Sequence, residues 1–459
     1  MLVSRMSTTT RPKRPDRDAE LELTIDSIAF GGNGVARHED YVLFVHGAIP
    51  GDRVRARVTK TRRNYGEALT VDILEPSTDR IAPVANHPGA PWQVLPYERQ
   101  LEIKAQQVEE ALRRLGKLDG FEMEPIVPAL EQWRYRNKLE YSFGTEGTAE
   151  RGKLIFGFHA PGMWDRIDPI DDCLLASERG NQVRDQVLDW CRAQGLTAYD
   201  RRTRRGFLRN LVVREGRRTG QIHARLVTMP GPLDEDSFAE AIDVDGLTWT
   251  RYDGLGETTT SGHTKQIAGE AYLEEELSGM TYRISPHAFF QVNTEMAEQL
   301  YGLAGEYAAL QGYERLYDLF CGIGTVGLTL SPRARELWGL EIIEPAVEDA
   351  IANARLNDVT NANFFAGDVR LALRELVSRA GAPDVVVVDP PRAGLSQRVV
   401  RRIIESGPRR LVYISCNPTT LAPNAAQLVE AGYVLKRVRP VDMFPQTPHI
   451  ECVALLEKP

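Results

Sequence analysis

The sequence predicts an α/β protein with a Rossmann-like sheet in its last third, a small N-terminal β-barrel and a central α+β domain between them. Apolar strands in the last third end in acidic residues, alternating strands crowd the region before residue 76, and 459 residues are enough for two or three cores. We expect a disordered tail over 1–19 and domains over 20–76, 77–292 and 293–459.

The predicted barrel consists of short alternating stretches between residues 20 and 76, separated by GGNG and PGD turns. Several strands in so short a segment are typical of a closed barrel that binds oligonucleotides. The stretches FGGNGVAR and PGDRVRARV resemble the TRAM domain, a barrel attached to several RNA-modifying enzymes. This resemblance implies RNA as the partner.

Two basic runs stand out in a chain whose net charge is −8. The first begins at Arg53 in a barrel strand, and the second, over 201–218, holds eight arginines with Phe207 among them. Arginines with an interleaved aromatic suit looped or single-stranded RNA, because they neutralise phosphates while the ring stacks on a base. Either run alone could equally be a solvated surface.

The central region begins with a predicted helix over 97–115, which Gly116 ends, followed by strand-like pieces. One face of the helix should be apolar. Its members are Leu101, Ala105, Val108, Ala111, Leu112 and Leu115.

The last third carries the ligand-binding signals. RLYDLFCGIGTVGLTL runs from a strand through three glycines into a helix, so a ligand can approach the backbone there. The next strand ends in Glu341, whose carboxylate can accept both ribose hydroxyls of a nucleoside. The same spacing would serve NAD, so Glu341 leaves the cofactor open.

Two further acidic residues follow strands. Asp368 lies after NFFAG, and Asp389 opens DPPR after a four-valine strand. With Asp318 near the end of the first strand, acidic residues stand at four strand ends, and together with D-P-P at the fourth they resemble a class I S-adenosylmethionine methyltransferase. A dehydrogenase would not need such a turn. An NAD oxidoreductase therefore stays only as a third hypothesis for the function, behind an RNA methyltransferase and a noncatalytic RNA-binding protein.

A cysteine ends the fifth predicted strand. Cys416, in LVYISCNP, should lie at the sheet edge where the glycine loop and Asp389 also lie. A lone intracellular cysteine is usually a small buried hydrophobe. We assign that role to the other cysteines, Cys173, Cys191, Cys321 and Cys452.

Five ordered motifs, SPHAFFQVN, DLFCGIGTVGL, VVDPPRAGL, YISCNP and HIECVALL, are similar to the RNA (uracil-5-)-methyltransferase family. The resemblance implies that Cys416 is the nucleophile, that Glu451 is the base, and that Asp389 contacts the uracil or the transferring methyl group. It further implies an S-adenosylmethionine site that includes Asp389 and the following residues: Gln291, Phe320, Thr325, Glu341 and Asp368.

That chemistry explains the residue types. Uracil C5 is a poor nucleophile, but addition of a thiolate at C6 gives it carbanion character. A carboxylate must later remove the C5 proton. A paired uracil is buried in its stack, so the enzyme must act on a loop or flip the base out, and Phe207, the arginine run and the barrel are the candidates for that task.

The sequence departs from the family at one point. Members with a TRAM domain often carry a four-cysteine iron–sulfur site, with three ligands just before the helix that begins near Tyr97. Here VANHPGAPWQVLP contains no cysteine, and Cys173 corresponds to the remaining position. One thiol cannot hold a cluster, so we expect none.

The remaining expectations concern partners and location. The odd cysteine count and the lack of a long apolar run predict a cytoplasmic protein that acts away from membranes. We also expect a monomer. We expect 23S ribosomal RNA as substrate, with transfer RNA as the second possibility. Methylation of cytosine C5 and a noncatalytic RNA-binding or folding role are two further hypotheses.

Overall fold

The computed structural model describes residues 14–147, 152–160, 163, 165–256, 258–259 and 261–459. It contains two compact units. The first comprises the chain up to Ala85 with Ala90–Ile103 and Gln446–Pro448, and the second comprises the rest. Most of the expected disordered tail, residues 1–13, lies outside the described residues. The three domain boundaries stay a prediction.

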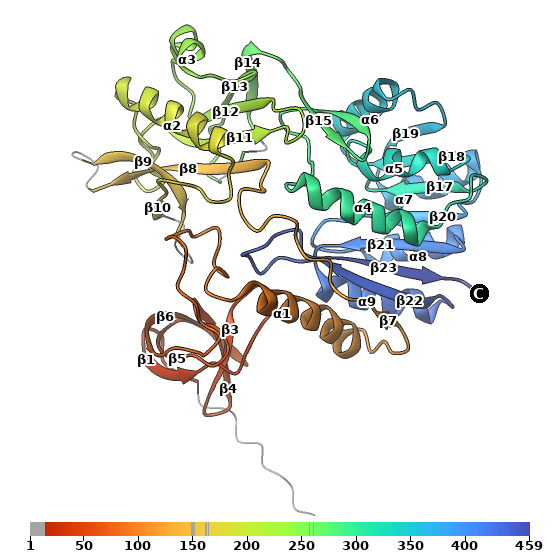
Figure 1. Cartoon of the computed structure of the whole chain (residues 1–459), viewed down its shortest axis with the longest axis horizontal. Coiled ribbons are helices and arrows are strands. Elements are labelled where there is room, and N and C mark those ends of the chain that lie inside the picture. Colours follow the sequence, from red (N-terminus) through yellow and green to blue (C-terminus); the bar gives the residue numbers. More distant parts are fainter. Residues whose placement is uncertain (1–13, 148–151, 161–162, 164, 257, 260) are drawn as a thin grey trace, which may run out of the picture. The chain divides into compact units, whose positions relative to one another are not determined.

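The first unit contains a six-stranded sheet that curves into a small barrel (Figure 1). Leu23, Tyr41, Leu43, Val45 and Val54 are among the side chains that fill it. All of its neighbouring strands are antiparallel except β4 and β6. In sheet order the strands are β1 (Glu20–Thr24), β5 (Arg53–Thr61), β6 (Tyr65–Glu75), β4 (Tyr41–His46), β3 (Gly34–His38) and β2 (Ser27–Ile28).

The basic residues of β5 are less available for binding RNA phosphates than the sequence suggested. Arg53 forms ion pairs with Glu22 and Glu75, and Lys60 lies 2.8 Å from Glu67. Because the acidic partners lie on the neighbouring strands β1 and β6, they neutralise much of the positive charge of this face. The ion pairs of this face are Arg53 with Glu22 and Glu75, Arg55 with Glu20 and Asp72, Arg57 with Glu20, and Lys60 with Glu67.

Helix α1 (Tyr97–Glu110) continues into a π-helical turn, η1 (Ala111–Leu115). The expectation that Leu115 belongs to the buried face is wrong, since its side chain is 58% exposed. The amide of Gly116 donates to the carbonyl of Ala111, five residues back, and this wider turn rotates the following side chains away from the α-helical stripe. Val108, Ala111 and Leu112 are buried as expected.

The second unit contains a seven-stranded sheet that is antiparallel except where β12 meets β13. Helices α2 (Glu178–Ala193) and α3 (Glu235–Ala241) share one apolar core with alternate strand residues such as Leu211, Ala224 and Leu226. In sheet order the strands are β10 (Ile167–Pro169), β9 (Lys153–His159), β8 (Lys138–Glu146), β11 (Leu208–Glu215), β12 (Ile222–Thr228), β13 (Gly246–Arg251) and β14 (His263–Gly269).

The same unit contains an eight-stranded sheet whose first five strands are parallel. Strand β23 then lies antiparallel between β21 and β22. The order is β19 (Ala362–Ala366), β18 (Glu336–Glu341), β17 (Arg315–Leu319), β20 (Val385–Val388), β21 (Arg410–Ser415), β23 (Glu451–Glu457), β22 (Val434–Val441) and β7 (Glu122–Met123). This is the expected Rossmann-like α/β sheet.

Helices cover both faces of this sheet (Figure 1). On one face Leu316, Val387 and Ile414 belong to the same core as α4 (Thr294–Ala308), α5 (Thr325–Leu330) and α6 (Glu344–Leu356), beside the hairpin β15 (Leu273–Leu277) and β16 (Met280–Ile284). On the other face the Tyr317 hydroxyl reaches α7 (Val369–Ala380), and the Tyr413 hydroxyl reaches Asn424 on α9 (Pro418–Glu430), next to α8 (Gln397–Ser406).

No helix among the described residues is both long and apolar enough to span a membrane.

The second unit contains a buried ion pair whose two members depend on each other. Lys104 Nζ lies 2.6 Å from Asp442 Oδ1, and both side chains are fully buried. Lys104→Met would remove the buried cation that lies 2.6 Å from this carboxylate, so the free energy of unfolding should fall by about 3–5 kcal/mol. Urea denaturation measures this change. The double variant Lys104→Met/Asp442→Leu should regain most of the loss, and a double variant as unstable as the single one would contradict this explanation.

Candidate active site

The glycine loop joins β17 to α5 at the carboxyl edge of the parallel strands. Phe320 has φ +69°, Gly322 +54° and Gly324 +86°, so the chain turns sharply through the left-handed region. A non-glycine residue there is uncommon, and Phe320 occupies a strained position. A Cβ on Gly327 would lie 2.7 Å from Asp318 Oδ2, so only glycine lets the helix approach that carboxylate.

Asp318 lies near the end of β17, just before the glycine loop, and was not among the predicted site residues. Its carboxyl group is unusual because one of its two oxygens is buried without a hydrogen bond from the described part of the chain. Its Oδ2 accepts a 2.8 Å hydrogen bond from the Gly327 amide, while its buried Oδ1 has no hydrogen-bond partner among the described residues. Burial raises its pKa to about 7. An unpartnered buried carboxylate oxygen fits a ligand that brings a cationic or N–H group.

Glu341 ends β18 beside this loop, as expected. Its Oε2 accepts from the Gly322 amide at 3.1 Å, and its Oε1 accepts from the amides of Ile342 and Ile343 at 2.7 and 2.9 Å. An ionised carboxylate can accept about four hydrogen bonds, and Glu341 already accepts three, so roughly one acceptor position remains for a ligand. One ribose hydroxyl can use it, while acceptance of both hydroxyls stays a prediction.

The loop before α4 brings Gln291 to Asp389. The two side chains are hydrogen-bonded, and the Gln291 carbonyl is held at 2.9 Å by Nδ2 of Asn137. On α4 itself, the Tyr301 hydroxyl lies 3.2 Å from Thr325 Oγ1. Gln291 is thus linked to Asp389, and Tyr301 to Thr325, at this edge of the sheet.

Asp368 lies at the end of the next strand but is engaged locally. Its side chain caps α7 by accepting from the Arg370 amide at 2.9 Å, and it also pairs with the Arg370 guanidinium, which lowers the pKa of the carboxyl. A role in cofactor binding stays a prediction.

Strand pairing brings Cys416 and Glu451 together. In the antiparallel register Ser415 is opposite Cys452, so the next positions, Cys416 and Glu451, face each other at the end of the ladder. Cys416 is half-buried and Glu451 is buried. The Glu451 Oε2 atom has no hydrogen-bond partner among the described residues. The other four cysteines are all buried, as expected.

The carboxyls of Asp389 and Glu451 and the thiol of Cys416 share this edge, where little water reaches them. Burial raises the pKa of Asp389 to about 7 and that of Cys416 to about 12, and it raises that of Glu451 well above its ordinary value. Asp389 further raises the pKa of Glu451, because two carboxyls in a low-dielectric site do not ionise readily together. Arg392 opposes these shifts at Cys416 and Glu451. The arrangement favours proton transfer at near-neutral pH.

Several residues of this edge escaped the sequence analysis. Arg392 and His449 stand inside the quoted DPPR and HIE motifs, which could have flagged them. Burial and nearby cations, Arg392 first among them, lower the pKa of His449 to about 4. Tyr301 had no such signal, since it lies on the apolar face of α4.

The arginine run over 201–218 is divided between two tasks. Its second half is structural: Arg214 donates to backbone carbonyls, and Arg217 and Arg218 pair with acids of α4. Phe207 is partly buried and packs against the core of the seven-stranded sheet, so the expectation that it stacks on a base has no support in its position. The first half of the run lines a pocket described below.

The residues around Cys173 do not fit an iron–sulfur cluster. Its Sγ lies 3.3 Å from Nε2 of His87, and both side chains are buried. No group of three or more His, Cys, Asp or Glu side chains in the described part of the chain could hold a metal ion. An iron–sulfur cluster needs four thiolate ligands, and Cys173 supplies a single thiol at this place.

Protein purified without oxygen should therefore contain no stoichiometric iron or acid-labile sulfide. Elemental analysis of the unreconstituted protein, together with its visible absorption spectrum, measures both. Iron and sulfide bound in a fixed ratio to the chain, and lost in Cys173→Ala, would contradict this expectation.

The raised pKa of Asp389 predicts a pH-dependent stability. Since the folded-state pKa lies near 7 and the ordinary value is 3.8, the ionised form is disfavoured by folding. The stability available below pH 4 is lost as pH rises through 7. Asp389→Asn should thus raise the unfolding free energy at pH 8, on the order of 2–4 kcal/mol, and change it little at pH 4. Denaturation at both pH values measures this, and an equal effect at the two would contradict it.

Comparisons with known proteins agree with this geometry. The family profile of tRNA (Uracil-5-)-methyltransferase matches residues 258–459, and that of the TRAM domain matches residues 18–71. Proteins described as uncharacterized RNA methyltransferases are 35% identical in Clostridium tetani (96% of this chain, 98% of the relative) and 38% in Gloeobacter violaceus (95% of each).

A solved structure is similar over nearly the whole chain. It is the tRNA (uracil-54, C5)-methyltransferase of Pyrococcus abyssi in complex with S-adenosyl-L-homocysteine, with a TM-score of 0.77, 27% identity, and coverage of 95% of this chain and 100% of that one. Together with the relatives, it places the chain in the RNA (uracil-5-)-methyltransferase family of S-adenosylmethionine-dependent enzymes with an N-terminal TRAM domain.

Proposed function

We propose that this enzyme transfers a methyl group from S-adenosylmethionine to C5 of a uridine in RNA through a covalent bond between Cys416 and uracil C6. One observation carries the proposal. The strand register continues to Cys416 and Glu451 as neighbouring positions, their side chains interact electrostatically, and both lie at the sheet edge that also holds Asp389 and the glycine loop.

The residues of the glycine loop fit S-adenosylmethionine. Asp318 offers a buried acceptor without a partner, and Glu341 keeps about one acceptor position for a ribose hydroxyl. The positive φ at Phe320, Gly322 and Gly324 bends the backbone so that a ligand can approach it. When bound there, S-adenosylmethionine supplies an electrophilic methyl group. Gln291, Thr325 and Asp368 are proposed to contribute further contacts.

Cys416 is proposed to activate the ring. Its sulfur bonds to C6, the C5–C6 π electrons move into an enolate, and C5 can then accept the methyl group. Burial keeps the thiol protonated in the free enzyme, so its proton must leave as the bond forms. The ionised form of Asp389, whose pKa lies near 7, is proposed to accept that proton. Arg392 is the nearby cation that favours the thiolate.

Glu451 is proposed to complete the reaction. After methyl transfer, its carboxylate removes the C5 proton, the C5–C6 double bond re-forms, and the electrons of the C6–S bond return to Cys416. Because its pKa is raised, Glu451 must first ionise, which Arg392 favours, and its ionised form is then a stronger base than an ordinary carboxylate. Asp389, hydrogen-bonded to Gln291, is proposed to contact the uracil beside the transferring methyl group.

We propose 23S ribosomal RNA as the substrate class, as the TRAM-containing layout suggested. Transfer RNA is the second candidate, because the Pyrococcus abyssi enzyme is a tRNA (uracil-54, C5)-methyltransferase and the matching family profile bears a tRNA name. Methyl transfer to unmodified transcripts of each class separates the two. A noncatalytic RNA-binding role is disfavoured by the intact pair of Cys416 and Glu451.

Glu451→Gln should trap the reaction after methyl transfer. Glutamine keeps the shape of glutamate and lacks its basicity, so addition and transfer can proceed while removal of the C5 proton stalls. The variant should accumulate a protein–RNA adduct that survives denaturing gel electrophoresis and needs S-adenosylmethionine for full yield. Cys416→Ala should form no adduct, alone or combined with Glu451→Gln.

Cys191→Ala serves as the matched control, because it removes a buried thiol from α2 without touching the site, and it should retain methyl transfer. Methylation of RNA by Cys416→Ala would refute the covalent route. An inactive Glu451→Gln that forms no adduct would refute only the role of Glu451 as the base.

A further inference from the structure

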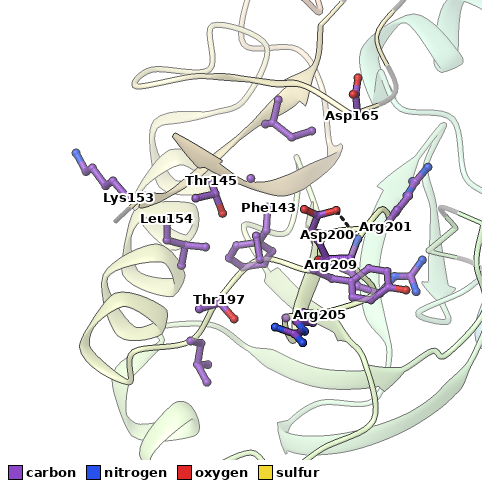
Figure 2. A pocket seen from close by; sticks show the side chains of 18 of the residues that line it. Phe143, Thr145, Lys153, Leu154, Asp165, Thr197, Asp200, Arg201, Arg205 and Arg209 are labelled. Atoms are coloured by element: carbon purple, nitrogen blue, oxygen red, sulfur yellow. Dashed lines mark hydrogen bonds between the residues drawn. The ribbon is translucent and has the colours of Figure 1, made fainter. Parts of the chain in front are cut away.

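A large basic pocket lies in the seven-stranded sheet, away from the candidate active site. Its volume is about 950 Å³, and its walls come from the ends of β8 and β9, the segment after α2 and the first half of the arginine run. Figure 2 shows Lys153 and Leu154 at the left of this pocket and Arg201 at its right.

The charge of the walls is strongly positive. Seven lysine or arginine side chains line the pocket against two carboxylates, and the pocket keeps a positive excess although Arg166 and Arg192 pair with Asp168 and Asp189 outside it. Both carboxylates are already used: Asp165 pairs with Arg202, and Asp200 accepts from the backbone amides of Arg202 and Thr203. The exposed side chains of Arg205 and Lys153, which lie in different walls, form no ion pair with any described residue. The pocket therefore offers charge to an external anion.

Arg209 shows that part of the wall is rigid. Its guanidinium lies 5.0 and 4.7 Å from the ring centres of Tyr199 and Tyr252 and donates a 2.7 Å hydrogen bond to the carbonyl of Gly254. These contacts hold the loop over 252–256 against β11 and preform this side of the pocket.

Strand β8 gives the distance from the pocket to the reacting groups. Asn137, just before β8, binds the carbonyl of Gln291, whose side chain contacts Asp389. Gly144 and Thr145, near the other end of β8, line the pocket. Seven residues of extended strand span roughly 23 Å, so an RNA that fills both places must continue several nucleotides beyond its target.

The size and lining favour a stretch of nucleic acid over a small molecule. Pockets for small ligands are mostly apolar and reach about 1,000 Å³ only at the upper end of their range. Here arginine forks, suited to phosphate oxygens, dominate the wall, and the substrate of the family is RNA. An acidic protein would match the charge, but it has no counterpart in the family's activity.

We propose that this pocket binds the phosphodiester backbone of the substrate RNA several nucleotides away from the target uridine and so anchors long substrates. The proposal rests on the proposed function in one respect, that RNA is the substrate. The anchor does not take part in the chemistry at Cys416.

Charge reversal tests the anchor. Arg205→Glu and, in a different wall, Lys153→Glu should each weaken binding of a long RNA by about tenfold. Each should also make the binding less sensitive to salt, because the slope of log K against log [salt] falls by about 0.7 for each phosphate contact that is lost on a single strand. Filter binding over a salt series measures both. A minimal loop RNA that cannot reach the pocket should bind equally well to the wild type and to both variants.

Arg379→Glu is the matched control, since Arg379 is an exposed arginine at the C-terminal end of α7, outside the pocket. It should leave binding of both RNAs unchanged. Unaltered binding of the long RNA by both pocket variants would overturn the proposal, and so would equal weakening of the long and the minimal RNA.

Two further outcomes separate this proposal from others. Poly-glutamate binding that disappears in Arg205→Glu, with RNA affinity retained, would assign the pocket to an acidic protein and overturn the anchor. Wild-type protein that binds both RNAs but methylates neither would refute the proposed function instead, because the anchor is measured by binding alone.

Discussion

The antiparallel pairing of β23 with β21 is the constraint on which the site depends. Because Ser415 lies opposite Cys452, the register sets Cys416 against Glu451 at the end of the ladder. A shift of one residue would turn Glu451 to the other face of the sheet. The parallel strands β17, β18 and β20 bring their carboxyl ends to the same edge, so the glycine loop, Glu341 and Asp389 meet the cysteine there.

Burial gives this edge its chemistry and weakens the fold in return. Three acids, Asp318, Asp389 and Glu451, are held where water is scarce, and their pKa values are raised as a result. Two of their oxygens, Oδ1 of Asp318 and Oε2 of Glu451, lack hydrogen-bond partners among the described residues. Such arrangements persist when the surrounding core is stable enough to support them, and here Leu316, Val387 and Ile414 belong to a large apolar core in the same sheet.

The sequence was sufficient where local pattern decides structure. Apolar strands, the glycine turn and the acids at strand ends predicted the Rossmann-like sheet and the position of Cys416. It was insufficient where distant residues meet. The partners of the β5 arginines lie on other strands, the packing of Phe207 depends on a core formed by several segments, and the π-helical turn that exposes Leu115 leaves no periodic signal. Asp318 counted among the acids at strand ends but not among the predicted site residues, because an acid near a strand end reveals nothing about an unpartnered oxygen.

The central claim is that methyl transfer occurs at C5 of uracil through Cys416. The most direct measurement uses RNA labelled with tritium at uracil C5 and S-adenosylmethionine labelled with carbon-14 in its methyl group, and follows both labels through a time course. This account predicts that one tritium is released to water for each methyl group incorporated, and that Cys416→Ala abolishes both. Incorporation of methyl groups without release of tritium would place the methylation at another atom and contradict the account.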